Sequence, residues 1–440
     1  MSGWNRREFL RGAQALALVA AASKAYAGRL PEQVASDEDL WREIRHAYVR
    51  DPKLINLNNG GVAPAPTLVL DAEIEAIRYS NLLPAVRMWT DLEPKIEDTR
   101  KKIAALWGAD PESIAITRNA SESLQIAQFG LDLKRGDEIL ITSQDYPRMI
   151  TTWQQRERRE GIVMRQVDFD VPVKRPEDLV AVYERNITPR TKVIHVSQVC
   201  FMTGQIFPIK EICALARQRG VTSIVDGAHA FAHVPFKFAN LPGGGEDGRN
   251  SVDCDFYGAS LHKWLSAPIG TGVLYVRRDR IAKHWALMAA PPSMDNNIRK
   301  FEEIGTHPAA MHNGIQQALA FYEQIGAERK FARLRYLKQR YAERLAKMQG
   351  VTVLVGLAPE LSGAFSTVQF DGVDAGKLAS TLLSQYNIVV VPISGPPLNG
   401  QAGAKPQFTG LRISPNVYTS VEEIDQFCDA VEKIVPTLRA

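Results

Sequence analysis

The strongest constraint on the fold is an alternation of short β-branched runs with helical stretches between about residues 110 and 277. Residues 113–117, 138–142, 192–196 and 223–225 have the composition of buried strands. Between two of them, residues 208–217 are typical of a helix, with a proline in the first turn and Gly220 beyond its end. This alternation predicts an α/β fold whose central sheet is mainly parallel and covered by helices on both faces.

The length of the chain favours one large domain and one smaller domain. Roughly 410 residues remain after a leader of 27, and 45% of the 440 residues are hydrophobic, so a sizeable core can form. We expect a leader at 1–27, an N-terminal arm at 28–60, a large domain at 61–310, and a linking helix with a small α+β domain at 311–440. A helical stretch over 311–348 would make the link, and 367–370 and 388–391 would be strands of the small domain. The glycine-rich segment 242–248 predicts an exposed loop.

The first residues have the pattern of an export signal. Residues 5–11 contain the pair Arg6 and Arg7, an apolar run follows from 13 to 22, and a small-residue site ends at Ala27. Paired arginines before Phe9 and Leu10 point to the twin-arginine export machinery and a periplasmic location. That route carries proteins that are already folded. The alternative is an amphipathic N-terminal helix with ordinary surface arginines.

Charge and cysteine content narrow the possible partners. Most of the formal net charge of +4 comes from the leader, where basic residues outnumber Glu8, so no case for a nucleic-acid partner remains. Beyond the leader there is no apolar run long enough to span a bilayer, so we expect no stable membrane anchor. The four cysteines, at 200, 213, 254 and 428, lack metal-ligand spacing and are predicted to be buried free thiols, with no metal site.

Side chains that could bind a ligand or take part in catalysis follow the predicted strands. Ser121, Tyr146, Gln198, Asp226 and Lys263 each come just after a strand. Because ligands of such sheets bind outside the carboxyl ends of the strands, these side chains are expected to converge on one edge.

Lys263 and Asp226 together predict a pyridoxal phosphate site. The cofactor needs an amine that forms an imine and an anion beside its ring nitrogen. Asp226 ends an apolar strand, where an unpaired anion is costly, and a pyridinium N–H would remove that cost. The alternatives are a surface lysine and an aspartate that caps the next helix.

A phosphate cradle is predicted at residues 117–122, which end a strand and open a helix. Backbone N–H groups there would face an anion, and Ser121 adds a hydroxyl, although a serine at a helix start is usually an N-cap. Ser260 and His262, beside Lys263, are polar groups of the kind that bind a phosphate.

The chain resembles the class V aminotransferase family of fold-type I pyridoxal-phosphate enzymes, in its isopenicillin-N-epimerase-like branch. The resemblance runs from residues 56–61 to 411–415, and its strongest motif is Asp226-Gly227-Ala228-His229 followed by Ser260-Leu261-His262-Lys263. It implies the fold-type I architecture, a pyridoxal 5'-phosphate cofactor and a homodimer with a shared active site.

The same resemblance implies individual roles. Lys263 would hold the cofactor and move the α-proton, Asp226 would pair with the ring nitrogen, and His229 would lie near the ring. The residues implied to contact the phosphate are Ala120, Ser121, Ser260 and His262, with Thr306 reaching the phosphate of the opposite subunit. Tyr146 would cover the ring where relatives have a histidine, Gln198 would bond the phenolic oxygen, and Arg412 would grip the carboxylate of a small amino substrate. For Arg412 alone, an ordinary surface arginine is an equal alternative.

Several reactions stay open on the sequence. The leading hypothesis is an exported enzyme acting at the α-carbon of an amino acid or a compound that contains one, with transamination first. Epimerisation and C–S or β-elimination are alternatives that share removal of the α-proton. Residues 391–411 contain no cysteine, which disfavours the desulfurases of the family. A non-catalytic binding module that kept the fold is the alternative outside enzymes.

Overall fold

The computed structural model describes residues 24, 26, 28–238, 251–397 and 404–439. The predicted leader, apart from two of its residues, and the glycine-rich segment 242–248 lie outside the described residues. Among the helices that are described, none combines the length and the apolar character that a membrane crossing requires.

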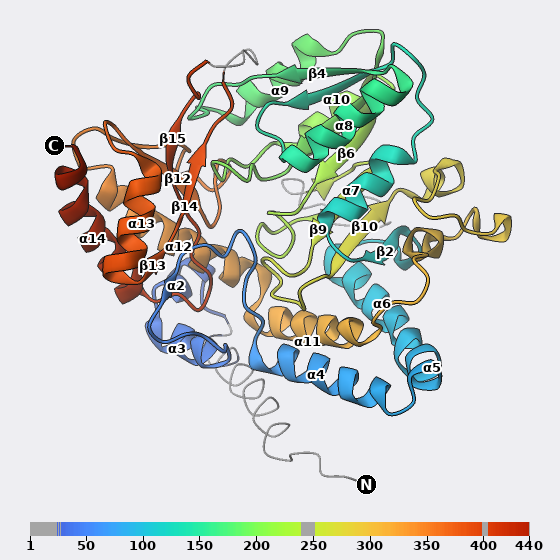
Figure 1. Ribbon diagram of the computed structural model, residues 1–440, viewed down its shortest axis with the longest axis horizontal. Coiled ribbons are helices and arrows are strands. Elements are labelled where there is room, and N and C mark those ends of the chain that lie inside the picture. Colours follow the sequence, from blue (N-terminus) through green and yellow to red (C-terminus); the bar gives the residue numbers. More distant parts are fainter. Residues whose placement is uncertain (1–23, 25, 27, 239–250, 398–403, 440) are drawn as a thin grey trace.

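A seven-stranded sheet forms the centre of the large domain (Figure 1). In spatial order its strands are β2 (Ile114–Thr117), β10 (Gly272–Val276), β9 (Phe256–Ser260), β6 (Thr222–Asp226), β5 (Thr191–Ser197), β3 (Glu138–Thr142) and β4 (Val163–Val167). The five strands from β9 to β4 are parallel, whereas β10 runs antiparallel to both of its neighbours. The predicted α/β fold with a mainly parallel sheet is confirmed.

Helices cover both faces of this sheet because successive strand side chains point to opposite sides. Ile139 and Ile141 pack on the face that carries α7 (Ala120–Phe129) and α8 (Pro147–Glu160), and Leu140 packs on the other face. That second face carries α6 (Ile96–Trp107), α9 (Pro176–Asn186), α10 (Ile209–Gln218) and α11 (Ala310–Ile325). Pro208 is the N-cap residue of α10, one position before the first turn in which we expected it.

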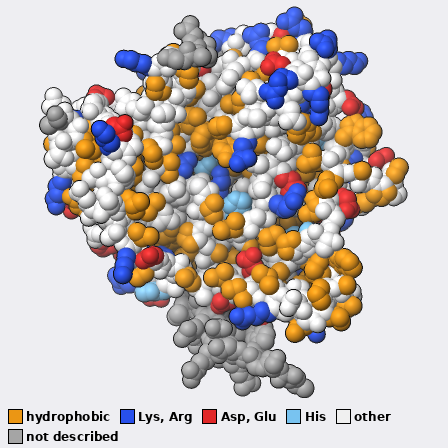
Figure 2. Space-filling model, viewed as in Figure 1, with side chains coloured by type: hydrophobic (Ala, Val, Ile, Leu, Met, Phe, Trp, Pro, Cys, Tyr) orange, Lys and Arg blue, Asp and Glu red, His pale blue; other side chains and the backbone are white. Residues whose placement is uncertain are grey.

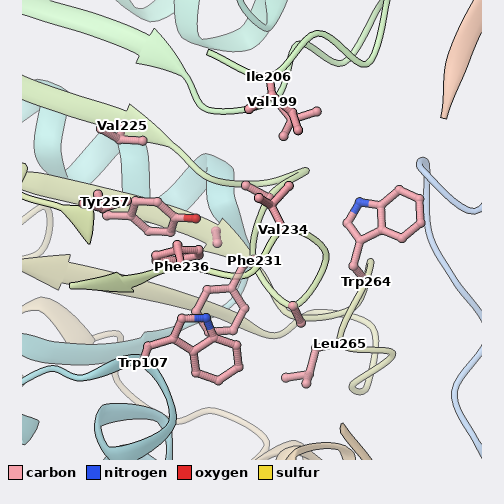
Figure 3. Close-up of a cluster of buried hydrophobic side chains, with 14 of the residues drawn as sticks. Trp107, Val199, Ile206, Val225, Phe231, Val234, Phe236, Tyr257, Trp264 and Leu265 are labelled. Atoms are coloured by element: carbon pink, nitrogen blue, oxygen red, sulfur yellow. The ribbon is translucent and has the colours of Figure 1, made fainter. Parts of the chain in front are cut away.

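Aromatic side chains fill part of the second face beneath the carboxyl edge of the sheet. Figure 3 shows Trp107 beside Phe231, and Tyr257 beside Phe236, with Trp264 across the intervening loop. The rings of Trp107 and Phe231 stack at 3.9 Å between centroids. This packing holds the loops after β6 and β9, which carry Asp226 and Lys263, on one rigid core.

The small domain contains a four-stranded antiparallel sheet. Its strands are β11 (Val351–Val353), β12 (Ser366–Phe370), β15 (Thr409–Ile413) and β14 (Val391–Ser394), and it carries α13 (Ala375–Tyr386) and α14 (Val421–Arg439). The predicted strand 388–391 is interrupted at Val390. Its first part, β13 (Ile388–Val389), pairs with β1 (Ile55–Asn56) of the N-terminal arm, and β14 pairs with β15.

The predicted helix over 311–348 is two helices. Gly326, with φ of 84°, ends α11, and α12 (Ala327–Leu345) follows. A side chain at this positive φ would be strained, which explains the break. The α11 helix packs against α4 (Thr67–Asn81) in the large domain, whereas Leu337, Tyr341 and Leu345 of α12 enter the core of the small domain. The arm helices α2 (Pro31–Ala35) and α3 (Glu38–His46) complete this side, where α2 contacts α12.

Candidate active site

Lys263 lies in the turn after β9, and its side chain points inward. Its Nζ is 3.1 Å from Nε2 of His229. Burial lowers the pKa of Lys263 to about 8, with the Asp226 carboxylate acting in the opposite direction and the Arg412 guanidinium in the same direction. A lysine with this pKa has a large neutral fraction near pH 8, and the neutral amine is the form that attacks an aldehyde.

Asp226 is the last residue of β6 and is 5% exposed. Its Oδ1 accepts a hydrogen bond of 2.9 Å from the backbone N–H of Ala228. Burial raises the pKa of this carboxyl, although the Ala228 N–H and Lys263 act in the opposite direction. The turn requires Gly227, because a Cβ there would lie 2.0 Å from the ring of Tyr257. A cationic N–H beside Asp226 would stabilise its charged form.

His229 lies beside the amine of Lys263. Burial lowers the pKa of His229 well below its usual value, so its ring is neutral, and Nδ1 is buried without a hydrogen-bond partner. With Nε2 directed at Lys263, the imidazole is placed to contact whatever is bound to the lysine amine.

Gln198 and Tyr146 follow β5 and β3. The backbone N–H of Gln198 donates to the carbonyl of Asp226 at 2.8 Å, and its Oε1 accepts from the hydroxyl of Tyr257 at 2.9 Å. The side-chain NH₂ of Gln198 is therefore left to donate to an oxygen of a ligand. Tyr146 is the N-cap residue of α8, is 36% exposed, and meets Phe201 edge to face at 5.4 Å.

An anion cradle forms where α7 begins. The backbone N–H of Ala120 donates to Oγ of Ser260 at 3.0 Å, so the Ser260 hydroxyl hydrogen is left to donate elsewhere. Nδ1 of His262 faces the carbonyl of Thr271 at 3.1 Å, which leaves Nε2 for a ligand. Ser121, partly buried, occupies the first turn of the helix. Asn119 is the N-cap residue, and its Oδ1 accepts from the N–H of Glu122, so part of the first turn is already capped, while the positive end of the helix dipole still favours an anion.

Arg412 of β15 is a buried cation whose hydrogen-bond partners are neutral. Its Nη1 donates to the carbonyl of Phe201 at 2.9 Å and its Nη2 to Oδ1 of Asn58 at 3.1 Å, while Nε is buried without a partner. Burial lowers the pKa of Arg412 to about 10, so the guanidinium is charged at neutral pH. Such a cation is favourable to bury when an anion accompanies it, and a carboxylate of a ligand fits that need. The sequence did not indicate Asn58 and Phe201 as partners of this arginine.

Thr306 lies apart from these residues in the same chain. It is exposed on the turn between η6 (Ile298–Glu302) and α11. The preceding Gly305 lines a cavity of about 430 Å³ together with Thr117 and Glu122, so this turn faces the start of α7 across open space. Figure 2 shows histidine and basic side chains recessed near the middle of the face on which the two domains meet.

The residues fit pyridoxal phosphate in three respects. A buried amine, a buried carboxylate and a helix N-terminus with hydroxyl and imidazole groups surround one position, and the orphaned nitrogens of His229 and Arg412 mark places for a ligand. Comparison with known proteins supports this fit. The family model for aminotransferase class-V matches residues 55–427. The chain belongs to the aminotransferase class-V family.

Relatives and solved structures agree with that assignment. The chain is 29% identical to isopenicillin N epimerase of Streptomyces clavuligerus over 411 residues, which covers 90% of this chain and 98% of the relative. It is also 29% identical to a probable cysteine desulfurase of Xylella fastidiosa, over 90% of this chain and 95% of the relative. A cystine C–S lyase, at 23% identity, has a TM-score of 0.72 over 88% of this chain and 98% of its own. A cysteine desulfurase of Escherichia coli, at 21% identity, has a TM-score of 0.73 over 90% of this chain and 99% of its own.

These similarities establish the fold and the cofactor. The structures show the same fold-type I architecture, and the family depends on pyridoxal phosphate. The protein is therefore a pyridoxal-phosphate-dependent enzyme of class V.

Proposed function

We propose that this enzyme acts at the α-carbon of an amino acid or of a compound that contains one. The observation that carries the proposal is the pairing of Lys263 with Arg412. Arg412 is buried and Lys263 is partly buried, and neither has an acidic hydrogen-bond partner among the described residues. Burial, and to a lesser degree Arg412, lowers the pKa of Lys263. A ligand with a carboxylate for Arg412 and an amine near Lys263 would satisfy both groups.

Each side chain has a part in this chemistry. Pyridoxal phosphate, when bound, supplies an aldehyde for the amine and a ring that withdraws electrons from the α-carbon. Lys263 would hold the cofactor through Nζ and then carry the α-proton, because its lowered pKa of about 8 gives the amine a large neutral fraction near that pH. Asp226 would keep a proton on the ring nitrogen, and Arg412 would orient the substrate carboxylate.

The outcome that we favour is inversion at the α-carbon. Two isopenicillin N epimerases match at 29% and 28% identity, each over 98% of its length, whereas transamination has the support of the family description. Relatives named as probable cysteine desulfurases also match, but residues 391–411 of this chain contain no cysteine. Desulfurase activity is thus disfavoured, and elimination at a C–S bond without a cysteine nucleophile stays an alternative.

Incubation in deuterated water tests the proposal. The holoenzyme is given a panel of L- and D-amino acids and isopenicillin N. We expect solvent deuterium at the α-carbon of a substrate with a mixture of configurations, whereas a keto acid would mark transamination. Lys263→Ala should abolish both the exchange and the visible absorption band of the bound cofactor, and exchange that persists in this variant would contradict the assignment. A protein that binds the cofactor but exchanges no α-proton would favour a binding role.

A homodimer is the second part of the proposal. Five hydrophobic side chains on α4, α5 (Pro84–Val86), η1 (Arg87–Leu92) and the connection between α4 and α5 are 48–71% exposed: Ile77, Leu82, Leu83, Val86 and Trp89. We call these five residues the α4–α5 face, and Figure 2 shows hydrophobic side chains gathered in the region where Figure 1 places these helices. Apolar patches of this kind mark interfaces. Trp89 also lines the cavity that Gly305 and Thr117 share, so a second copy on this face would lie near the start of α7 and bring its own Thr306 there.

Export by the twin-arginine route is the third part. Its support is the order of Arg6-Arg7, the apolar run and the small residues up to Ala27. Replacing both arginines by lysine should retain the uncleaved protein in the cytoplasm, as seen by fractionation and immunoblotting. Unchanged periplasmic recovery of that variant would argue against this route.

A further inference from the structure

One buried carboxylate beside the site has no role in the chemistry described so far. Asp145, 1% exposed, accepts four hydrogen bonds, two on each oxygen. Oδ2 accepts from the backbone N–H and the hydroxyl of Thr142 at 2.8 and 2.7 Å. Oδ1 accepts from the backbone N–H and the hydroxyl of Ser197 at 3.0 and 2.6 Å. Each oxygen therefore serves the end of a different strand, β3 or β5.

The bridge made by Asp145 lies where the chain connections leave two neighbouring strands in opposite directions. The chain leaves β3 through α8 toward β4, and it leaves β5 through α10 toward β6, so the connections from these two neighbours depart in opposite directions. Such a switch point opens a crevice at the carboxyl ends of the strands. The β3–β5 ladder ends at the pair Leu140 and Ile194, short of Thr142 and Ser197. The Asp145 carboxylate accepts the N–H groups that the ladder no longer uses.

The residues held in this way adjoin the predicted cofactor contacts. Tyr146 follows Asp145 directly, and Gln198 follows Ser197. The backbone N–H of Gln198 donates to the carbonyl of Asp226, and Ser197 is the register partner of Asp226. Asp145 is therefore linked to Asp226 through two adjacent residues of β5 and its end, because Ser197 donates to Asp145 and Gln198 donates to Asp226.

We propose that Asp145 is a positioning residue of the active site, which fixes Tyr146 and Gln198 against the cofactor by joining the ends of β3 and β5. The proposal rests on the proposed function, because it assigns those two residues to cofactor contacts. Burial raises the pKa of Asp145 to about 6, with the donors of Ser197 and Thr142 acting in the opposite direction and Asp226 in the same direction, so the group is ionised at neutral pH. A carboxylate accepts at four positions, whereas an amide in its place turns two donors toward N–H groups.

A second buried carboxylate, at the amino ends of the sheet strands, serves as a control. Asp255, 3% exposed, accepts from the backbone N–H and the hydroxyl of Ser223 at 2.8 and 3.3 Å. It precedes β9, and Ser223 lies near the start of β6, so this second carboxylate joins two strands at their amino ends. Asp255 also forms ion pairs with Arg277 and Arg280. Asp255→Asn therefore removes a strand bridge together with two ion pairs and controls for loss of stability, whereas only Asp145 is next to the candidate site.

Three measurements on the two variants separate positioning from general stability. They are the dissociation constant of pyridoxal phosphate, the circular-dichroism band of the bound cofactor, and hydrogen exchange at Tyr146, Ser197 and Gln198 in the cofactor-free protein. We expect Asp145→Asn to raise the dissociation constant roughly tenfold or more, as loss of hydrogen bonds to a charged group implies. The dichroic band should weaken and the three amides should exchange faster. Asp255→Asn should lower the unfolding temperature and leave all three readouts unchanged.

The outcomes distinguish this proposal from the proposed function. Equal losses of stability in both variants, with unchanged cofactor affinity and dichroism, would overturn the positioning role. If Asp145→Asn fails to fold, Ser197→Ala, which removes one of the four donors, should still weaken the dichroic band, and an unchanged band would overturn the role equally. Failure of the unaltered protein to carry the cofactor on Lys263 after borohydride reduction would instead refute the proposed function, while the exchange measurement would still decide whether Asp145 holds β3 to β5.

Discussion

At the scale of single residues, the first prediction concerns Arg412, which we propose binds the carboxylate of the substrate. Two of its N–H groups are committed to Phe201 and Asn58, and a buried Nε remains for a ligand. We expect Arg412→Lys to lower kcat/KM roughly 10- to 150-fold, mostly through KM, because a single ammonium nitrogen cannot take the separate positions of the guanidinium nitrogens that face Phe201, Asn58 and a ligand. Steady-state kinetics on a substrate identified by deuterium exchange shows how much of the loss lies in KM and how much in kcat. Arg344→Lys, in a surface ion pair with Glu432, is the control, and an equal loss there would remove the special role of Arg412.

Sequence reasoning found the residues whose position follows from a strand end, and it missed those whose role depends on a distant partner. Lys263, Asp226 and Gln198 come together because parallel strands end at one edge, as expected. Asp145 directly precedes the predicted ring-covering Tyr146, but its link to Ser197 joins residues 52 positions apart, and that of Arg412 to Asn58 joins residues 354 apart. Such pairings depend on sheet order, which strand composition does not specify.

At the scale of secondary-structure elements, two buried lysines of helix α12 predict how the stability of the protein depends on pH. Lys330 donates to the carbonyl of Trp264 and Lys338 to the hydroxyl of Ser362, and burial lowers the pKa of each to about 7. The unfolded chain therefore binds more protons than the folded one between pH 7 and about 10.5, so stability should rise with pH in that window by up to about 1.4 kcal/mol per pH unit for each lysine. Urea unfolding at pH 7.5 and 9 measures this rise.

The matched variants are Lys338→Met, which should reduce the rise, and Lys347→Met at an exposed position, which should not. A pH dependence that stays the same in Lys338→Met would show that the lysine is charged in the folded protein.

Other elements differed from expectation for reasons that are local or tertiary. Gly326 divides the predicted long helix because its backbone has positive φ, and this residue was visible in the sequence. The interruption at Val390 could not be predicted from the local sequence, since it follows from the pairing of β13 with β1, more than 300 residues earlier. Continuous β-branched runs such as 138–142 were identified correctly because burial on both faces leaves an unbroken apolar pattern.

At the scale of the whole molecule, the exposed α4–α5 face predicts that the protein forms a dimer. Leu82 and Leu83 are 71% and 53% exposed, and a solvated apolar face of this kind favours association. We expect the protein to be a dimer by light scattering after gel filtration, and the double variant Leu82→Glu/Leu83→Glu to be a monomer, because burying two carboxylates opposes the contact. Leu383→Glu, at a 48% exposed position of α13 in the small domain, should remain a dimer.

The same variant tests whether the site is shared between subunits. Thr306 is exposed in its own chain, and the turn that carries it faces the start of α7 across a cavity that Trp89 also lines. If the partner subunit supplies this threonine to the phosphate, the monomeric variant should lose cofactor affinity along with its partner, and Thr306→Val should lose affinity while remaining a dimer. A monomer that binds pyridoxal phosphate as tightly as the unaltered protein would show that each chain completes its own site.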